Sequence, residues 1–275
     1  MAAPLPARQA RRTTRRRKPE RDPFGYDPKL HAQVRPLSEF FYRRYWRVQT
    51  DGVEHVPAKG AVLVVGNHSG GIPLDAAMIV TALDLEHPQH RLLRFVYDKF
   101  VADMPFVGEF YDRMGAVVAS YDNARTLLVR GQAVGLFPEG VEGMAKGIGR
   151  RYQLQRFRTG FVRLSLELRV PIVPVAVVGA EETYPVIAKW HSAALTRLLN
   201  VPYVPVTPLF PLLGVIGMLP LPTRWHIRFG EPLRLYTQPG VTHTDRRTVN
   251  RLTEEVRRLI QGMVHALLAE RTSLF

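Results

Sequence analysis

The most informative segment of the chain is Gly66-Asn67-His68-Ser69-Gly70-Gly71-Ile72-Pro73-Leu74-Asp75. It follows an apolar run at residues 61–65 that is typical of a buried strand, and it precedes a run at residues 76–83 that is typical of a helix. A short turn rich in glycine and proline therefore joins a strand to a helix. Catalytic groups concentrate on such turns, because the rigid elements on either side hold the side chains of the loop in place.

The turn carries one imidazole and one carboxylate, which suits general base catalysis. A histidine such as His68 can take a proton from a hydroxyl near neutral pH. A carboxylate behind the ring, here that of Asp75, would fix the tautomer and stabilise the imidazolium. The chain has no Cys and no Gly-x-Ser-x-Gly elbow, and Ser69 adjoins His68 without that context. The pattern favours attack by a hydroxyl of the substrate. The alternative is a helix-capping Asp75 and a polar His68 at the end of a strand.

A second block stands about 70 residues further along the chain. Residues 133–137 form another short apolar run, which leads into Pro138-Glu139-Gly140. With Asn67-His68 upstream of this block, the sequence resembles the PlsC-like glycerolipid acyltransferases, which include lysophosphatidate acyltransferases and a monoacylglycerol/diacylglycerol acyltransferase-like branch. Two weaker blocks, residues 110–113 and 170–175, follow in the order of that family. The resemblance covers about residues 50–185.

This resemblance implies an O-acyltransferase that moves a fatty acyl group from acyl-CoA or acyl-carrier protein to a hydroxyl of a glycerolipid or lysophospholipid, in phospholipid or neutral-lipid biosynthesis. It implies that His68 is the general base and that Asp75 orients it. Glu139 and Gly140 would shape the acceptor pocket, with Arg113 near the head group. The donor is a substrate, so no resident cofactor is expected, and we see no His and carboxylate cluster that predicts a metal site. The candidate substrate-binding residues are Asn67, Ser69, Gly70, Arg113, Glu139, Gly140 and Lys146.

The blocks depart from the family pattern in two places. Asp75 stands seven positions after His68, where the family usually has five, so the Gly-Pro turn must loop out the extra residues. The Glu139-Gly140 block continues into Val141-Glu142, where the family has Thr-Arg or Ser-Arg. This change removes an arginine expected near an acceptor phosphate. Lys146, Arg150 and Arg151 follow closely and could take its place.

The composition limits the choice of partners. The chain has 275 residues, of which 46% are apolar, and this suits one large domain. The absence of Cys excludes disulfides and is consistent with a reducing compartment. The formal net charge is +14, and eight of the 38 Lys and Arg lie in residues 8–21. Such an excess favours an anionic membrane surface, a CoA-like donor or nucleic acid. No nucleic-acid motif accompanies the charge, so nucleic acid is not expected.

Two segments bear on localisation. Residues 1–30 predict a disordered basic arm ahead of an acyltransferase domain at residues 31–275, and no apolar stretch of a signal peptide follows the basic run. Residues 37–48 predict a helix that mixes aromatic residues with Arg and lies either at a membrane interface or against the core. Residues 198–223 lack Lys, Arg, Asp and Glu, but six prolines argue against a transmembrane helix. We predict an apolar loop there that contacts lipid or covers the core, and a protein attached peripherally to the cytoplasmic side of a membrane.

The alternation of expected strands and helices predicts a single α/β domain with a mixed, mostly parallel sheet flanked by helices. Parallel strands would bring His68 and Glu139 to one edge of the sheet, because both residues follow strand ends. Two rival functions stay open: a lipid hydrolase with Ser69 as nucleophile, and a non-catalytic membrane- or lipid-binding protein. The remaining expected strands are residues 92–97, 114–118, 171–177 and 225–229, and the remaining expected helices are residues 121–130, 161–168 and 245–268.

Overall fold

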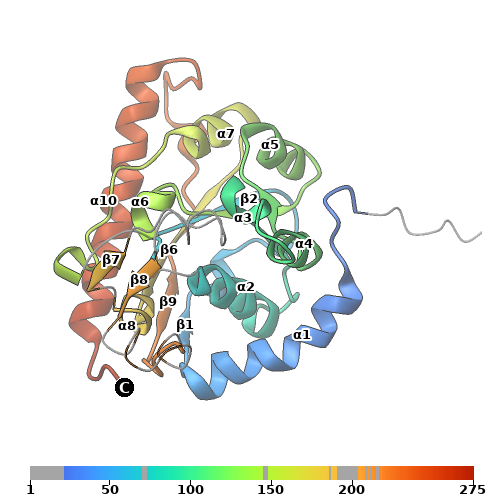
Figure 1. Cartoon of the computed structure of the whole chain (residues 1–275). Helices are drawn as coiled ribbons and strands as arrows, with labels where there is room; N and C mark the ends of the chain where they lie inside the picture. Colours follow the sequence, from blue (N-terminus) through green and yellow to red (C-terminus); the bar gives the residue numbers. More distant parts are fainter. Residues whose placement is uncertain are drawn as a thin grey trace, which may run out of the picture.

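A seven-stranded sheet forms the centre of the molecule, with strand order β1-β9-β6-β2-β5-β3-β4 (Figure 1). Neighbouring strands are parallel, except that β9 runs antiparallel to β6. The strands are β1 (Gln49–Asp51), β2 (Val62–Gly66), β3 (Leu93–Tyr97), β4 (Val117–Val118), β5 (Ala133–Leu136), β6 (Ile172–Val178) and β9 (His226–Phe229). The computed structural model describes residues 22–69, 73–144, 148–185, 187–190, 204–207, 210, 212, 214, 217 and 219–275.

Helices cover both faces of the sheet. Figure 1 shows α5, α7 and α10 on one side and α1 and α2 on the other. The longer helices are α1 (Pro28–Phe40), α2 (Leu74–Glu86), α4 (Val107–Arg113), α5 (Tyr121–Val129), α7 (Gly160–Leu168) and α10 (Arg246–Glu270). The short helices are η1 (Phe41–Tyr45), η2 (Val53–His55), α3 (Lys99–Ala102), α6 (Val141–Met144), η3 (Ile148–Arg150), α8 (Ala180–Thr183) and η5 (Leu235–Thr237), and a separate antiparallel pair joins β7 (Ala188–Trp190) to β8 (Val204–Val206).

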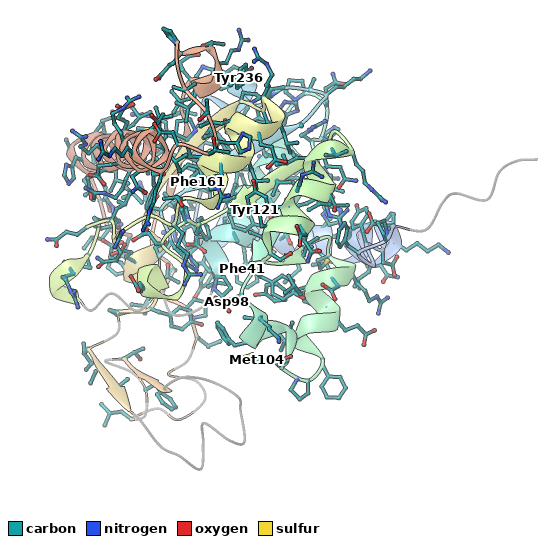
Figure 2. The ribbon with its side chains drawn as sticks, turned by 90° about the horizontal axis from the view of Figure 1, so that it is seen from above. Phe41, Asp98, Met104, Tyr121, Phe161 and Tyr236 are labelled. Atoms are coloured by element: carbon teal, nitrogen blue, oxygen red, sulfur yellow. The ribbon has the colours of Figure 1, made fainter. Side chains whose placement is uncertain are left out.

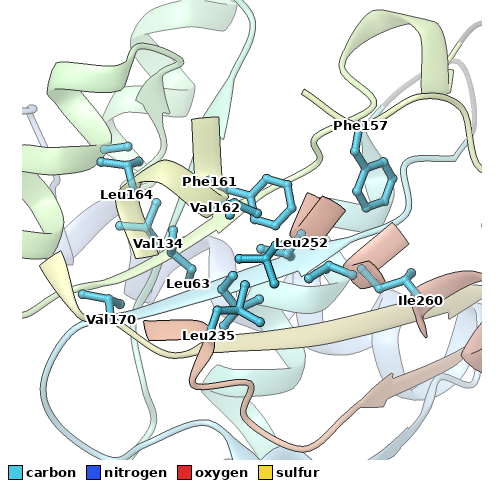
Figure 3. Close-up of a cluster of buried hydrophobic side chains, with 14 of the residues drawn as sticks. Leu63, Val134, Phe157, Phe161, Val162, Leu164, Val170, Leu235, Leu252 and Ile260 are labelled. Carbon is cyan, nitrogen blue, oxygen red and sulfur yellow. The ribbon is translucent and has the colours of Figure 1, made fainter. Parts of the chain in front are cut away.

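The alternation of side chains along β2 builds two separate cores. Val62 and Val64 point to the face covered by α2 and η1, whereas Leu63 and Val65 point to the face covered by α5, α7 and α10. All four side chains are buried, so β2 is a central strand with apolar side chains on both faces. Figure 3 shows the second of these cores, where side chains of α7 and α10 pack onto Leu63.

The predicted α/β fold with a mostly parallel sheet is confirmed, and the local differences have physical causes. The helix expected at residues 37–48 begins at Pro28, capped by the Asp27 carboxylate, and closes in the π-helical η1. Residues 28–30 of the predicted arm therefore belong to α1. Strand β1 was not expected, because its three residues carry no apolar pattern. Strand β8 lies in the apolar stretch predicted as a loop.

The carboxyl ends of β2, β3, β5 and β6 lie along one edge of the sheet, which is where open α/β sheets bind their ligands. Four connections leave this edge: the turn before α2, the α3–α4 corner, the chain after β5, and α8 with the β7–β8 pair. Figure 2 shows Asp98 and Met104, on the α3–α4 corner, toward the same side of the molecule as β7 and β8. Among the described residues, no helix is both long and apolar enough to cross a membrane.

Candidate active site

His68 and Asp75 are hydrogen-bonded across the turn that follows β2. His68 Nδ1 lies 2.8 Å from Asp75 Oδ2, with both side chains buried. Because a carboxylate only accepts, this contact assigns the proton to Nδ1 and leaves the lone pair of Nε2 free for a substrate. The pair therefore forms although Asp75 stands seven positions after His68.

Asp75 is held by the backbone on both of its oxygens. Oδ2 also accepts the backbone N–H of Ser69 at 2.8 Å, and Oδ1 accepts the backbone N–H of Ala76 at 2.8 Å. The Ser69 hydroxyl donates to the same Oδ2 at 3.3 Å, so it faces Asp75 rather than His68. These donors fix the carboxylate behind the imidazole.

Glu139 ties the two sequence blocks together. Its Oε1 accepts the backbone N–H of His68 at 2.9 Å, and its Oε2 accepts the backbone N–H of Gln155 at 2.6 Å. The side chain is 1% exposed, so these contacts lie away from solvent. Glu139 therefore sets the backbone position of the candidate base from a different strand.

The imidazole of His68 rests on an apolar floor. Its ring stacks on Phe137 with centroids 4.3 Å apart and planes at 19°, and Phe137 packs in turn against Phe95 at 4.6 Å. Gly143 packs closely against the start of the same side chain, since a methyl group there would lie 2.9 Å from His68 Cβ and 2.7 Å from Glu139 Cβ. The base is thus held by stacking and by close backbone approach, and only 6% of the residue is exposed.

Other candidate residues make structural contacts. Asn67 donates to Val177 O at 3.0 Å and accepts from Val177 N at 2.8 Å, so its amide extends the β2–β6 pairing by one step. Arg113, half exposed at the end of α4, pairs with Asp27 at 2.9 Å. Gly140 adopts φ +59°, a left-handed conformation that glycine tolerates. Gly70 and Lys146, both predicted to bind substrate, lie outside the described residues.

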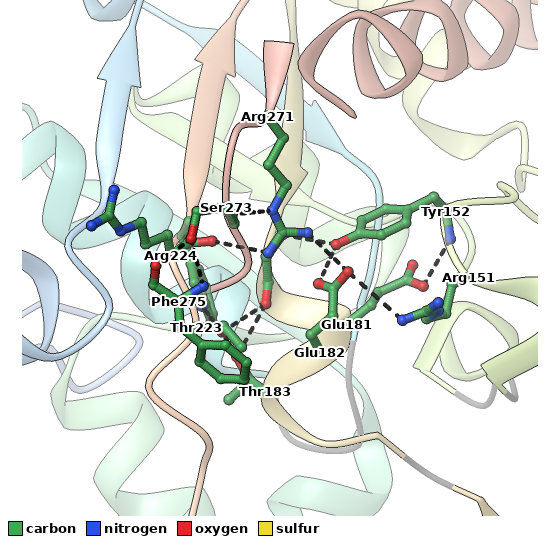
Figure 4. A network of polar contacts seen from close by, with 12 residues as sticks. Arg151, Tyr152, Glu181, Glu182, Thr183, Thr223, Arg224, Arg271, Ser273 and Phe275 are labelled. Carbon is green, nitrogen blue, oxygen red and sulfur yellow. Dashed lines mark hydrogen bonds and ion pairs between the residues drawn. The ribbon is translucent and has the colours of Figure 1, made fainter. Parts of the chain in front are cut away.

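The 152–158 segment, which lacks helix and strand, forms a wall beside Glu139. Side chains of α10 hold its backbone: Gln261 accepts Leu154 N–H at 2.9 Å and donates to Tyr152 O at 2.7 Å. Glu181 accepts the backbone N–H of Tyr152 at 2.8 Å (Figure 4). The Tyr152 hydroxyl and Arg271 both donate to the Glu182 carboxylate, as Figure 4 shows. Arg271 Nη1 lies 2.9 Å from Glu182 Oε1. The segment is thereby anchored to α8 and to α10.

Two tyrosines lie near the site on the α3–α4 side. Burial raises the pKa of Tyr111 to about 12, and the negative charge of Asp75 adds to the increase. Tyr97 packs against Tyr111 with centroids 5.3 Å apart and ring planes tilted by 56°, and its hydroxyl donates to Asp112 at 2.8 Å. Both phenols therefore stay protonated at neutral pH and are available only as neutral hydrogen-bonding groups.

The sequence left several of these contacts unassigned. Phe137 and Gly143 flank the predicted Glu139-Gly140 block, so their proximity in the chain was a usable signal. Gln155 acts through its backbone N–H, which any residue except proline supplies, so no side-chain pattern could reveal it. The described residues contain no group of three or more His, Cys, Asp or Glu that could hold a metal ion.

Together these contacts describe a buried imidazole with a carboxylate on one nitrogen and a free lone pair on the other. It lies at the carboxyl edge of a parallel sheet. Such an arrangement can accept a proton from a hydroxyl and return it to a leaving group. No serine or cysteine side chain among the described residues donates to the imidazole, so the geometry supplies a base without a protein nucleophile beside it.

Several known proteins are similar to this chain in sequence. A family model described as Acyltransferase matches residues 47–178. An uncharacterised protein of Mycobacterium tuberculosis is 43% identical over 256 residues, which cover 92% of this chain and 71% of that protein. A probable 1-acyl-sn-glycerol-3-phosphate acyltransferase of Mycoplasma pneumoniae is 28% identical over 169 residues, 58% of this chain and 60% of that protein.

The fold has a solved counterpart. The crystal structure of the 1-acyl-sn-glycerophosphate acyltransferase PlsC from Thermotoga maritima aligns with a TM-score of 0.55 and 16% identity, over 89% of this chain and 83% of that one. At this identity the likeness concerns the fold. The matched family region, residues 47–178, contains both sequence blocks and the hydrogen-bonded His68–Asp75 pair. The chain belongs to the acyltransferase family.

Proposed function

We propose that this acyltransferase moves a fatty acyl group from an acyl thioester to a hydroxyl of a glycerolipid, with His68 as general base. The observation that carries the proposal is the 2.8 Å contact between His68 Nδ1 and Asp75 Oδ2, which leaves Nε2 as the proton acceptor. The family supplies the reaction type, and the pair supplies the base that such a reaction needs.

The proposed reaction has two steps. The acceptor hydroxyl attacks the thioester carbonyl carbon while His68 Nε2 takes its proton, and a C–O bond forms. The tetrahedral intermediate then collapses, the C–S bond breaks, and the thiolate takes the proton from the imidazolium. Asp75 stabilises the imidazolium between these steps. No resident cofactor takes part, since the thioester brings its own leaving group.

The oxyanion of the intermediate needs hydrogen-bond donors. The backbone N–H groups of His68 and Ser69 already donate to Glu139 and Asp75, so they do not serve this purpose. The donors are therefore to be sought beyond Ser69.

Two features support a membrane surface as the place of reaction. The α3–α4 corner exposes Phe106, at 89%, together with Phe110, and α3 follows the carboxyl end of β3. Leu212 and Leu219 are exposed on the chain that follows β6. The two groups come from connections on either side of β2 and β5, which carry the candidate site. We infer that this edge meets the lipid phase that holds the acceptor.

The hydrolase alternative receives no support from the geometry. A nucleophilic serine must donate its hydroxyl to the base. The Ser69 hydroxyl instead donates to Asp75, and the residue is buried.

The test is acyl transfer by the purified chain, with acyl-CoA or acyl-carrier protein as donor. The acceptor panel holds lysophosphatidate, lysophospholipids, monoacylglycerol and diacylglycerol. His68→Ala is expected to lower kcat about 10²-fold or more. His243→Ala, a loop variant away from the site, serves as the control. Equal activity of His68→Ala and wild type rules out His68 as the base. No transfer by wild type with any donor favours a binding protein.

A further inference from the structure

The chain after the Glu139-Gly140 turn is strongly basic. Residues 143–166 contain six Lys or Arg and no Asp or Glu. Some of these cations have partners: Arg151 lies 3.9 Å from Glu182, and Arg163 stacks over the Tyr121 ring at 5.7 Å. The local charge next to the site therefore favours an anionic ligand.

Arg158 is the member of this basic run that contacts the candidate site. A methyl group on Gly140 would lie 3.4 Å from both Cζ and Nη2 of Arg158, so the guanidinium lies directly over the turn. The backbone N–H of Arg158 donates to Pro138 O at 2.9 Å, which fixes the start of this side chain beside the same turn. Arg158 thus contacts both neighbours of Glu139, the residue that holds the His68 backbone.

The backbone that leads to Arg158 is held by Glu139 of the turn and by α10. Gln155, three residues earlier, is bonded to Glu139, and Leu154 is bonded to Gln261 of α10. The Arg158 side chain is itself exposed. Among the residues that the structure describes, no carboxylate pairs with its guanidinium. The side chain thus starts from a fixed backbone with its donors available to a ligand.

We propose that Arg158 binds a phosphate-type group of a substrate at the Glu139-Gly140 turn. A guanidinium presents planar paired donors that match phosphate oxygens, and such charge-assisted bonds are the strong ones. This inference rests on the proposed function for its choice of ligands. Both the acceptor and a CoA donor can carry the group, so the two sources must be separated by experiment.

The experiment compares binding by full-length wild type, Arg158→Ala, Arg158→Lys and the control Arg156→Ala, whose side chain is exposed on the same segment. Calorimetry measures three ligands: short-chain lysophosphatidate below its micelle concentration, monoacylglycerol with the same acyl chain, and CoA. Arg158→Ala is expected to weaken binding of at least one phosphate ligand by about 10- to 100-fold. Binding of monoacylglycerol should stay unchanged, and Arg158→Lys should recover part of the loss.

A loss confined to lysophosphatidate assigns the turn to the acceptor, and a loss confined to CoA assigns it to the donor. Equal weakening of all three ligands, or the same behaviour in Arg158→Ala and Arg156→Ala, overturns the proposal. Acyl transfer is measured separately on the same proteins. Wild type that binds through Arg158 but transfers no acyl group would refute the proposed function and keep this inference. Acyl transfer by a protein whose ligand binding does not depend on Arg158 would refute this inference and keep the proposed function.

Discussion

Asp75 Oδ2 accepts three hydrogen bonds: from the His68 ring, the Ser69 backbone and the Ser69 hydroxyl. Oδ1 also accepts, from the Ala76 backbone N–H, so an amide in either orientation would turn its NH2 group toward a donor. The turn therefore requires a side chain at position 75 that accepts hydrogen bonds on both of its terminal atoms. The same geometry gives Asp75 and Ser69 different roles. Asp75 orients the ring, whereas the Ser69 hydroxyl only adds a longer hydrogen bond to the carboxylate.

We predict opposite outcomes for two substitutions at this turn. Asp75→Asn should lower kcat by about 10²–10⁴-fold, because the amide disturbs the ring tautomer and no longer stabilises the imidazolium. Ser69→Ala should cost less than about tenfold, since it removes only the 3.3 Å bond. Steady-state acyl transfer measures both variants, with circular dichroism as a folding control. A Ser69→Ala enzyme as inactive as Asp75→Asn would revive Ser69 as the nucleophile.

At the scale of single elements, the short helix α6 matters because Gly143 fits between His68 and Glu139. A methyl group at Gly143 would come within 2.9 Å of His68 Cβ. Cβ atoms cannot approach that closely, so the turn must shift. The α10 helix offers a matched glycine, because Gly262 is exposed and has no atom within 4 Å of the same methyl position.

Gly143→Ala should therefore destabilise the fold by about 1–3 kcal/mol and lower kcat, since the base is displaced. Gly262→Ala should instead stabilise it by about 0.5–1 kcal/mol, because alanine favours a helix interior. Chemical denaturation gives the free energies, and acyl transfer gives kcat. If both alanines behave alike, the close packing of Gly143 against His68 is wrong.

Elements with a strong apolar pattern could be predicted from the sequence. The side chains of β2, β5 and β6 and of one face of α10 are buried, so their positions in the sequence are apolar and reveal each element. The three-residue β1 has no such run and owes its place to pairing with β9, which is distant in the chain. At the site, His68 and Asp75 were found through their side-chain chemistry. The contact of Glu139 with Gln155 could not be predicted, because Gln155 contributes only its backbone N–H.

At the scale of the whole molecule, a buried ion pair fastens the start of the described chain to the sheet. Arg94 of β3 is 1% exposed and meets Asp22 in two contacts, at 2.6 and 3.1 Å. Its guanidinium also faces the rings of Phe24 and Tyr26 at 5.8 and 5.7 Å. Burial by itself would raise the pKa of Asp22, but the hydrogen bonds from Arg94 and the backbone bring it below its usual 3.8.

Asp22→Asn should lower the free energy of unfolding at pH 7 by about 3 kcal/mol, because it leaves a buried arginine without its counter-charge. The lowered pKa means that this stabilisation is present above pH 3.8 and is lost as the pH falls through the pKa of the folded state. The gap between variant and wild type should therefore narrow at acidic pH. Denaturation at several pH values measures it. Arg251→Ala, which breaks an exposed pair on α10, should cost less than about 1 kcal/mol. Equal losses in the two variants would contradict the prediction.

The exposed aromatic residues of the α3–α4 corner, Phe106 and Phe110, would carry the proposed contact with lipid. Phe106 combines 89% exposure with φ +65°, a left-handed conformation that costs a residue with a side chain about 1–2 kcal/mol. Holding a phenylalanine in water at a strained position is unfavourable unless the ring is buried elsewhere during function. A lipid surface at the carboxyl edge would bury it together with Phe110 and bring the acceptor to His68.

Replacing Phe106 and Phe110 by Ser should therefore weaken binding to phospholipid vesicles by at least about tenfold, as expected when two partly buried aromatic side chains are lost. Vesicle flotation measures the bound fraction. Leu259→Ser is the matched control, because Leu259 is also exposed but belongs to α10 and not to the α3–α4 corner. The double variant should keep its melting temperature, since both rings are exposed. If it binds vesicles as tightly as Leu259→Ser, lipid contact lies elsewhere on the molecule, and the orientation proposed for the active site must be abandoned.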